Sequence, residues 1–261
     1  MRLEIVGGAA WLTFDRPETR NAISKEIILA LGDALLRLED DARVKCIVFT
    51  GAGAHFVGGG DVKAFNETLG MAPAARRQRY QDRIHASIGA YAALEAVGKP
   101  TIARVRGAVA GAAISFVLSS DFAIAAESSF FVFAHRALSL PPDAALSYFL
   151  PRVVGWRRAK QLTLLGARLN SQQALEAGIV TECVPDGQLD AACEALILRL
   201  IDGPPIGARE TKRLLNVSLH NSIAEQLRLE GLAVGECVAS ADFVEGVRAF
   251  MEKRKPDFAG E

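Results

Sequence analysis

The sequence lacks an excess of charge of either sign, a long apolar run and a secretory pattern. Its 30 basic residues balance its 30 acidic residues, so no net field attracts nucleic acid and we expect no nucleic-acid partner. No stretch of 18 apolar residues occurs, so we expect no membrane-spanning helix and no membrane partner. Glu4 interrupts the short apolar segments at the amino terminus, which is not typical of a signal peptide.

Cysteine is also scarce, and its positions indicate neither a metal site nor a disulfide framework. None of the four cysteines forms a C-x-x-C pair, and no histidine lies at metal-ligand spacing from them. Their neighbours are mostly apolar, which is typical of buried free thiols in a reducing compartment. We therefore expect a cytoplasmic protein without a bound metal. The four are Cys46, Cys183, Cys193 and Cys237.

Apolar residues, by contrast, make up 50% of the chain, and their spacing predicts alternating strands and helices. Leu3–Val6 and Ala10–Phe14, separated by two glycines, predict a hairpin. Lys25–Asp40 has apolar residues at helical spacing, and Ser24 is the expected N-cap. The alternation continues to about residue 190 and predicts an α/β core with crossover connections. One of the later helices is expected to begin at Asp143, after two prolines.

Residues 51–61 contain the consecutive glycines Gly58, Gly59 and Gly60, for which three interpretations compete. A dinucleotide fingerprint is incomplete, because Phe56 occupies the position of its third glycine. A purely structural turn is the second interpretation. The third is a backbone that recognises an anion, since glycines let N–H groups approach a ligand and a helix starting at Asp61 adds its positive end.

A second loop of the same kind favours the third interpretation. Residues 107–115 read GAVAGAAIS, in which Gly111, Ala112 and Ala113 offer N–H groups that no large side chain blocks. Two such loops can each supply one backbone donor to the same oxygen, which makes an oxyanion hole. That geometry suits a thioester carbonyl that becomes an enolate.

Six motifs follow one another along the chain: DRPETRNAIS (15–24), HFVGGGDVKAF (55–65), KPTIARVRGAVAGAAIS (99–115), SLPPDAALSYFLPRVVG (139–155), LLGARLNSQQALEAGIVTECV (164–184) and DFVEGVRAFMEKRKPDF (242–258). With these six motifs in this order, the chain resembles the crotonase superfamily, the enoyl-CoA hydratase/isomerase family, over essentially its whole length. The resemblance implies a crotonase-type spiral of ββα turns over residues 1–195 and a helical C-terminal trimerisation region over residues 196–261. It also implies an acyl-CoA substrate and a homotrimer or a dimer of trimers.

The resemblance also implies roles for particular residues. The family's oxyanion donors correspond to the amides of Gly60 and Ala112, although the family usually has glycine at the second position. The two glutamates that hydratases of the family use correspond to Ser115 and His135. Because addition of water needs groups that activate the water and manage the α-proton, the loss of both glutamates makes simple hydration unexpected.

Asp143 is the candidate acid–base residue. The isomerase branch of the family, including enoyl-CoA isomerases and phenylacetate-pathway ring isomerases, carries a single carboxylate at this position. One carboxylate suffices for a Δ3,Δ2-enoyl-CoA isomerase-type 1,3-proton shift through an enolate, which would place the enzyme in fatty acid metabolism. Two alternatives stay open: Asp143 is a helix cap, and His135 is a second acid or base.

Further residues are implied to bind coenzyme A, which is part of the substrate, so that no separate cofactor is expected. Arg20 and Ala22 are placed beside the nucleotide, Ser115 and His135 in the acyl pocket, and Phe250 and Lys253 at a neighbouring subunit's ligand. The remaining contacts run along the glycine loop: Gly58, Gly60, Asp61 and Val62.

Other functions remain possible on the same fold. One is a dehalogenase-like reaction in which Asp143 attacks as a nucleophile and a separate histidine activates water, but no histidine stands at the matching place. Another is an acyl-CoA-binding protein without catalysis. Hydratase activity is the third.

Overall fold

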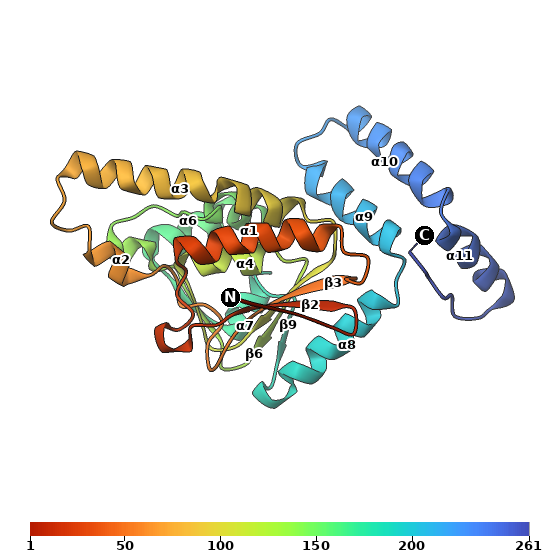
Figure 1. The fold of residues 1–261 in the computed structure, drawn as a ribbon, viewed down its shortest axis with the longest axis horizontal. Helices are drawn as coiled ribbons and strands as arrows, with labels where there is room; N and C mark the ends of the chain where they lie inside the picture. The colour runs from red at the N-terminus through yellow and green to blue at the C-terminus, as the bar shows by residue number, and fades with distance from the viewer. Residues whose placement is uncertain (261) are drawn as a thin grey trace.

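A six-stranded sheet forms the centre of the computed structural model, which describes residues 1–260 (Figure 1). The strand order is β1-β2-β3-β4-β6-β9, and all neighbours pair in parallel except β1 and β2, which form an antiparallel hairpin. The strands are β1 (Arg2–Val6), β2 (Ala9–Phe14), β3 (Cys46–Gly51), β4 (Thr101–Val105), β6 (Phe122–Ala126) and β9 (Glu182–Val184).

A second, three-stranded sheet has the order β5-β7-β8, with β5 and β7 parallel and β7 and β8 antiparallel. Its strands are β5 (Ala108–Ala110), β7 (Phe130–Val132) and β8 (Arg168–Asn170). The chain passes from β4 in the large sheet to β5 in the small one, and likewise from β6 to β7. Repeated passage between the two sheets, with helices between the turns, gives the predicted spiral of ββα units.

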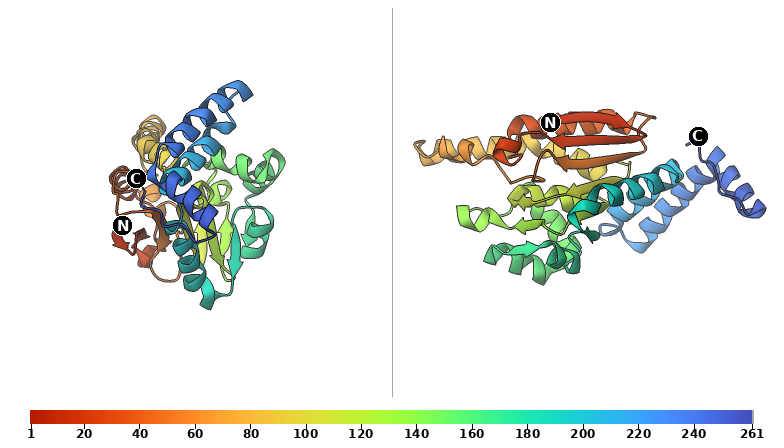
Figure 2. Two further views of the ribbon diagram at one scale, coloured as in Figure 1. Left: turned by 90° about the vertical axis from the view of Figure 1, so that its right-hand side faces the viewer. Right: turned by 90° about the horizontal axis from the view of Figure 1, so that it is seen from below.

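Eleven α-helices among residues 1–260 surround the sheets and extend beyond them (Figures 1 and 2). Helices α1 and α3 pack against each other over one face of the large sheet, and α8 covers the other face with Leu189, Cys193 and Ile197. The helices are α1 (Lys25–Glu39), α2 (Val62–Asn66), α3 (Pro73–Ala96), α4 (Ile114–Ser119), α5 (Leu146–Val154), α6 (Trp156–Leu165), α7 (Ser171–Glu176), α8 (Leu189–Ile201), α9 (Pro205–Ser218), α10 (Ile223–Val238) and α11 (Ala241–Glu252).

The predicted hairpin and the predicted helix that follows it are confirmed. Gly7 and Gly8 both have positive φ, +56° and +86°, as expected for the tight turn of a hairpin between β1 and β2. Helix α1 begins at Lys25, and the Ser24 side chain accepts a hydrogen bond from the amide of Ile27. This cap satisfies one of the amides that a helix start leaves without a partner.

The prediction of a helix beginning at Asp143 is wrong. Ala144 and Ala145 have φ of 54° and 61°, in the left-handed region, and α5 begins only at Leu146 without a side-chain cap. Alanine seldom adopts positive φ, so sequence patterns favour continuing the helix back to Asp143. The predicted capping role of Asp143 is therefore also wrong.

The C-terminal helices differ in position from the core. Helix α8 runs without a break through residues 195 and 196, while α9, α10 and α11 extend away from the sheets (Figures 1 and 2). The division of the chain at this point stays a prediction. No helix in the described part of the chain is long and apolar enough to cross a membrane.

Candidate active site

The glycine loop is fixed by the buried side chain of Asn21. Its Nδ2 donates hydrogen bonds to the carbonyl oxygens of Ala52, His55 and Phe56 at 2.9, 2.8 and 3.0 Å, and its Oδ1 accepts one from the Arg16 amide at 2.9 Å. The sequence analysis selected the neighbours of Asn21 and missed Asn21 itself. Its signal is an asparagine in a turn, because asparagine tolerates the positive φ of 60° found here.

Two of the three glycines have a steric reason to be glycine. A Cβ on Gly58 would lie 2.9 Å from the Cβ of Arg20, and Gly59 has a φ of +105°. The loop can therefore run close between residues 20–23 on one side and residues 108–110 on the other. Isolated bridges Ile23↔Gly60 and Val57↔Val109 fix it to both neighbours.

The amide of Gly60 points away from Ile23. In the bridge, the Ile23 amide donates to the carbonyl of Gly59, and the Asp61 amide donates to the carbonyl of Ile23. Successive amides of an extended chain point to opposite sides, so the intervening amide of Gly60 faces the other way. Among residues 1–260 this amide has no hydrogen-bond partner.

The amide of Ala112 is free because it lies in the first turn of a helical segment. A 3-10 turn at Gly111–Ala113 leads directly into α4, and the first N–H groups of a helix have no partner within it. Gly111 has a φ of +54° where the chain leaves β5. No group in the described chain accepts a hydrogen bond from the Ala112 amide.

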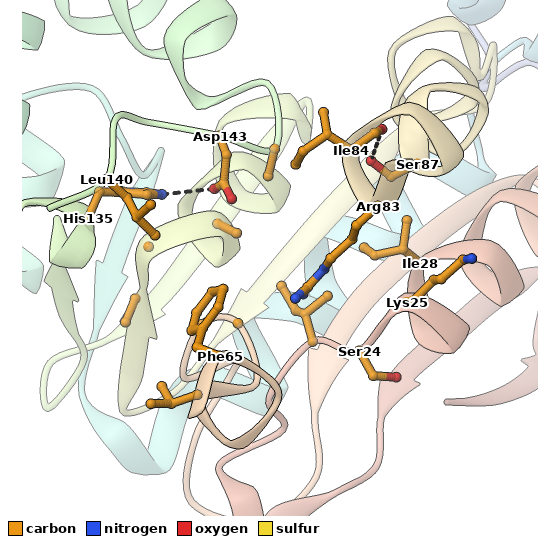
Figure 3. Close-up of a pocket in the computed structure, with 18 of the residues that line it drawn as sticks. Ser24, Lys25, Ile28, Phe65, Arg83, Ile84, Ser87, His135, Leu140 and Asp143 are labelled. Carbon is orange, nitrogen blue, oxygen red and sulfur yellow. Dashed lines mark hydrogen bonds and ion pairs between the residues drawn. The ribbon is translucent and has the colours of Figure 1, made fainter. Parts of the chain in front are cut away.

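Both amide-bearing loops line one cavity, together with Asp143. The cavity lies between the start of α1, the glycine loop, α3 and the segment 134–144 (Figure 3). Apolar side chains form much of its wall, and Asp143 is the one carboxylate among its lining residues. Its lining includes Ile23, Ile28, Gly58, Gly60, Val62, Phe65, Arg83, Ile84, Tyr91, Ala112, His135, Leu138, Leu140 and Asp143.

Asp143 and His135 face each other at one side of the cavity (Figure 3). The Nε2 atom of His135 lies 2.9 Å from Oδ1 of Asp143. The histidine side chain is 9% exposed, whereas that of Asp143 is 41% exposed. Both side chains line the cavity, and the carboxylate is the more exposed of the two.

Tyr91 is a further polar residue that lines the cavity, and the sequence analysis missed it. Burial raises the pKa of its phenol above the usual range, and the negative charge of Asp143 raises it further. Tyr91 therefore stays a neutral hydrogen-bond donor at physiological pH. Its ring stacks on Phe116 of α4 with a centroid distance of 6.2 Å. The helical position of Tyr91 in the sequence does not indicate that it lines the cavity, because the direction of the side chain depends on how α3 packs in the fold.

The charged residues nearest the cavity mouth are Lys25 and Arg83, which the sequence analysis also missed. Both line the cavity and a polar cleft beside it, between α1, α2 and α3. The Arg83 guanidinium lies over the ring of Phe65, 5.6 Å from its centroid. The two side chains place positive charge at the point where the cavity meets this cleft.

Val62, Asp61 and Ser115, three other predicted contacts, lie in different surroundings. Val62 lines the cavity, while Asp61 lines the polar cleft and lies 3.5 Å from Arg16. Ser115 is fully buried with no hydrogen-bond partner in the described chain, and it does not line the cavity.

The other predicted contacts do not reach the cavity within one chain. Arg20 is exposed and Ala22 is buried beside the glycine loop. Phe250 and Lys253 lie at α11, at the opposite end of the molecule from α2 (Figure 1). Their predicted contact with a neighbouring subunit's ligand stays a prediction.

Comparison with known proteins gives consistent matches along the whole chain. Residues 4–261 match the family model described as enoyl-CoA hydratase/isomerase. A Rhodobacter capsulatus protein named "Probable enoyl-CoA hydratase" is 36% identical over 100% of this chain and 98% of its own length. The 1,2-epoxyphenylacetyl-CoA isomerase of Escherichia coli is 35% identical over 97% of this chain and 96% of its own. The crystal structure of enoyl-CoA hydratase from Bacillus anthracis superposes with a TM-score of 0.91 at 27% identity, covering 100% and 99% of the two chains.

Proposed function

The chain belongs to the enoyl-CoA hydratase/isomerase family, and from this membership we propose that it is an isomerase that moves a double bond within an enoyl-CoA. The observation that carries the proposal is the single carboxylate, Asp143, among the residues that line the cavity. A 1,3-proton shift needs one group that takes a proton and returns it. Addition of water, by contrast, calls for one group that activates the water and one that manages the α-proton.

In the proposed reaction the thioester oxygen accepts hydrogen bonds from the amides of Gly60 and Ala112. The Asp143 carboxylate removes a proton from the α-carbon of a 3-enoyl-CoA, and the electron pair of that C–H bond moves into the enolate. The two amides stabilise the negative charge that develops on the oxygen. Asp143 then returns the proton to the γ-carbon, which leaves a 2-enoyl-CoA. One proton moves and no electrons are exchanged between molecules, so the reaction needs no redox cofactor or metal.

The acyl group would occupy the apolar part of the cavity, beside Phe65, Ile84 and Leu140. Lys25 and Arg83, which line both the cavity and the polar cleft, supply the positive charge that phosphate groups of coenzyme A favour. The cleft also contains carboxylates, which are Glu26, Asp61, Glu67 and Asp82. The acyl end of the substrate is thus assigned to the apolar cavity, and the coenzyme A end to the polar cleft beside it.

The test is to incubate the purified protein with a 3-enoyl-CoA and follow formation of the conjugated 2-enoyl thioester by its ultraviolet absorbance. Hydration is followed in parallel with a 2-enoyl-CoA. Because general acid–base catalysis contributes about 10²–10⁴-fold, we expect Asp143→Asn to lower kcat for isomerisation by about that factor.

The matched control is Asp33→Asn, which makes the same change at an exposed position of α1 and should leave kcat unaltered. Isomerisation that survives in Asp143→Asn, or hydration that outpaces isomerisation in the natural protein, would contradict the proposal. Binding of acyl-CoA without turnover would instead favour the non-catalytic alternative.

A further inference from the structure

We propose that His135 is a positioning residue, which holds Asp143 in one orientation and directs its second oxygen, Oδ2, into the cavity. The inference deepens the proposed function and rests on it, because it concerns the carboxylate that the proposed isomerisation uses. His135 is given no proton to exchange with the substrate. Its role is to determine which oxygen of Asp143 does so.

The direction of the hydrogen bond follows from the chemistry of the two groups. A carboxylate oxygen can only accept a hydrogen bond, so the Nε2 atom of His135, 2.9 Å from Oδ1, must carry the proton. This bond occupies Oδ1. No other side chain or backbone group among residues 1–260 bonds to the Asp143 carboxylate, so Oδ2 remains free.

The local backbone explains why the carboxylate needs such a partner. Asp143 follows a 3-10 turn at Ala134–Leu138 and precedes α5, in a segment with no helix or strand of its own. Ser139, Ala144 and Ala145 all have positive φ. Without the histidine, the side chain would be free to rotate, because nothing else in the described chain holds its oxygens.

His135 also lies next to the second amide-bearing turn. A Cβ built on Gly111 would lie 3.7 Å from Cε1 of His135, so the imidazole lies beside the turn that precedes the Ala112 amide with no Gly111 side chain between them. The side chain is almost fully buried and therefore has little freedom to move. One rigid ring thus sets the spacing between the proton carrier and the amide that stabilises the enolate.

Other polar groups that line the cavity do not replace this contact. Tyr91 and Arg83 reach it from α3, and Lys25 reaches it from the start of α1. None of the three forms a hydrogen bond or ion pair with Asp143. His135 is therefore the one group in the described chain that can orient the carboxylate directly.

The test compares two substitutions of His135. Phenylalanine fills a similar space but donates no hydrogen bond, whereas glutamine keeps an N–H donor. A misplacement of about 1 Å at a reacting group costs about 100-fold in rate. We expect His135→Phe to lower kcat for isomerisation by about 10–100-fold. KM should change by less than about twofold, because substrate binding does not depend on the orientation of the Asp143 side chain. His135→Gln should recover most of the rate.

His85→Phe is the matched control, because His85 is exposed on α3 and does not line the cavity. It should leave both kcat and KM unaltered. Thermal unfolding of each variant shows whether it is folded. A crystal structure of His135→Phe supplies a readout that needs no turnover, in which we expect the Asp143 side chain in more than one rotamer.

The outcomes separate the two proposals. Full activity of His135→Phe alongside an inactive Asp143→Asn would overturn the positioning role and leave the isomerase proposal standing. An active Asp143→Asn would overturn the isomerase proposal. If folded His135→Gln is as impaired as His135→Phe, or if Asp143 keeps one unchanged rotamer in the phenylalanine variant, a hydrogen-bond donor at this position is not what orients the carboxylate.

Discussion

At the scale of single residues, one buried side chain holds the loop that carries the Gly60 amide. Asn21 is fully buried and satisfies three carbonyl oxygens of residues 52–56. Those carbonyls belong to a loop that lacks strand pairing for much of its length. The position of the Gly60 amide therefore depends on a residue that itself never reaches the cavity.

We predict that Asn21→Ala destabilises the fold by about 2–4 kcal/mol. The substitution leaves the buried carbonyl of Phe56 without this donor, at about 1–3 kcal/mol, and the part-buried carbonyls of Ala52 and His55 at less each, because water can reach them. Urea unfolding followed by circular dichroism measures the change. Asn216→Ala, which removes one bond from an exposed amide to the carbonyl of Glu95, should cost less than about 1 kcal/mol. Equal effects of the two substitutions would show that the loop does not rely on Asn21.

Sequence patterns located the residues of the candidate site better than they described their surroundings. Gly60, Ala112 and Asp143 all line one cavity, and each was found from its motif. The contact between His135 and Asp143 was not predicted, because the chain between them turns through Ser139 with a positive φ of 56°, which local preference does not favour. Tyr91 was missed for a different reason, since helical spacing does not say which neighbour a helix packs against.

At the scale of secondary-structure elements, the buried Lys212 ties α9 to the amino-terminal ends of β4 and β6, two interior strands of the large sheet. Its Nζ lies 2.8 Å from Oδ2 of Asp121 and donates to the carbonyl of Lys99 at 3.0 Å. The same carboxylate oxygen accepts hydrogen bonds from the amide and hydroxyl of Thr101 at the start of β4. The first of the extending helices is thus anchored by a charge placed against two strands.

We predict that Lys212→Met destabilises the protein by about 3–5 kcal/mol, because removal of one partner leaves a largely buried charge uncompensated. Chemical denaturation measures the loss, and the double variant Lys212→Met with Asp121→Asn should recover part of it. Lys255→Met is the control: its ion pair with Asp202 is exposed on both sides, and its loss should cost less than about 1 kcal/mol. A loss that small at Lys212 would refute the anchoring role.

The elements that sequence patterns predicted correctly are those that short-range interactions define. The hairpin of β1 and β2 depends on two adjacent glycines, and α1 depends on its own apolar stripe and on Ser24. The beginning of α5 could not be predicted in the same way. Its start at Leu146 is set by the two preceding residues, Ala144 and Ala145, whose positive φ is incompatible with a right-handed helix.

At the scale of the whole molecule, the helices that extend from the core expose an unusual amount of apolar surface. An apolar cavity lies between α9 and α11, and several large apolar side chains of α10 and α11 are exposed in the single chain. Soluble monomers rarely expose such continuous patches. The exposed side chains include Ile223, Leu227, Leu232, Val234, Phe243, Val244, Val247, Phe250 and Met251.

We predict that the protein assembles through these helices and has a mass in solution of three or six times 27.9 kDa. Phe250 is 83% exposed in the single chain, so Phe250→Glu should lower the mass without unfolding the chain. Light scattering after size-exclusion chromatography measures it. Leu36→Glu, a similar change at an exposed position of α1, should leave the mass unaltered. A monomer at all concentrations would refute the prediction.

The segment that carries Asp143 belongs to neither sheet, whereas the Gly60 and Ala112 amides are built into bridges and a helix start. In the proposed reaction, the groups that stabilise the negatively charged oxygen are therefore separate from the group that transfers the proton. Replacing this short segment would give the same fold a different proton-transferring residue and leave the two amides in place. This separation offers a physical reason why proteins that share one fold carry the names of different reactions.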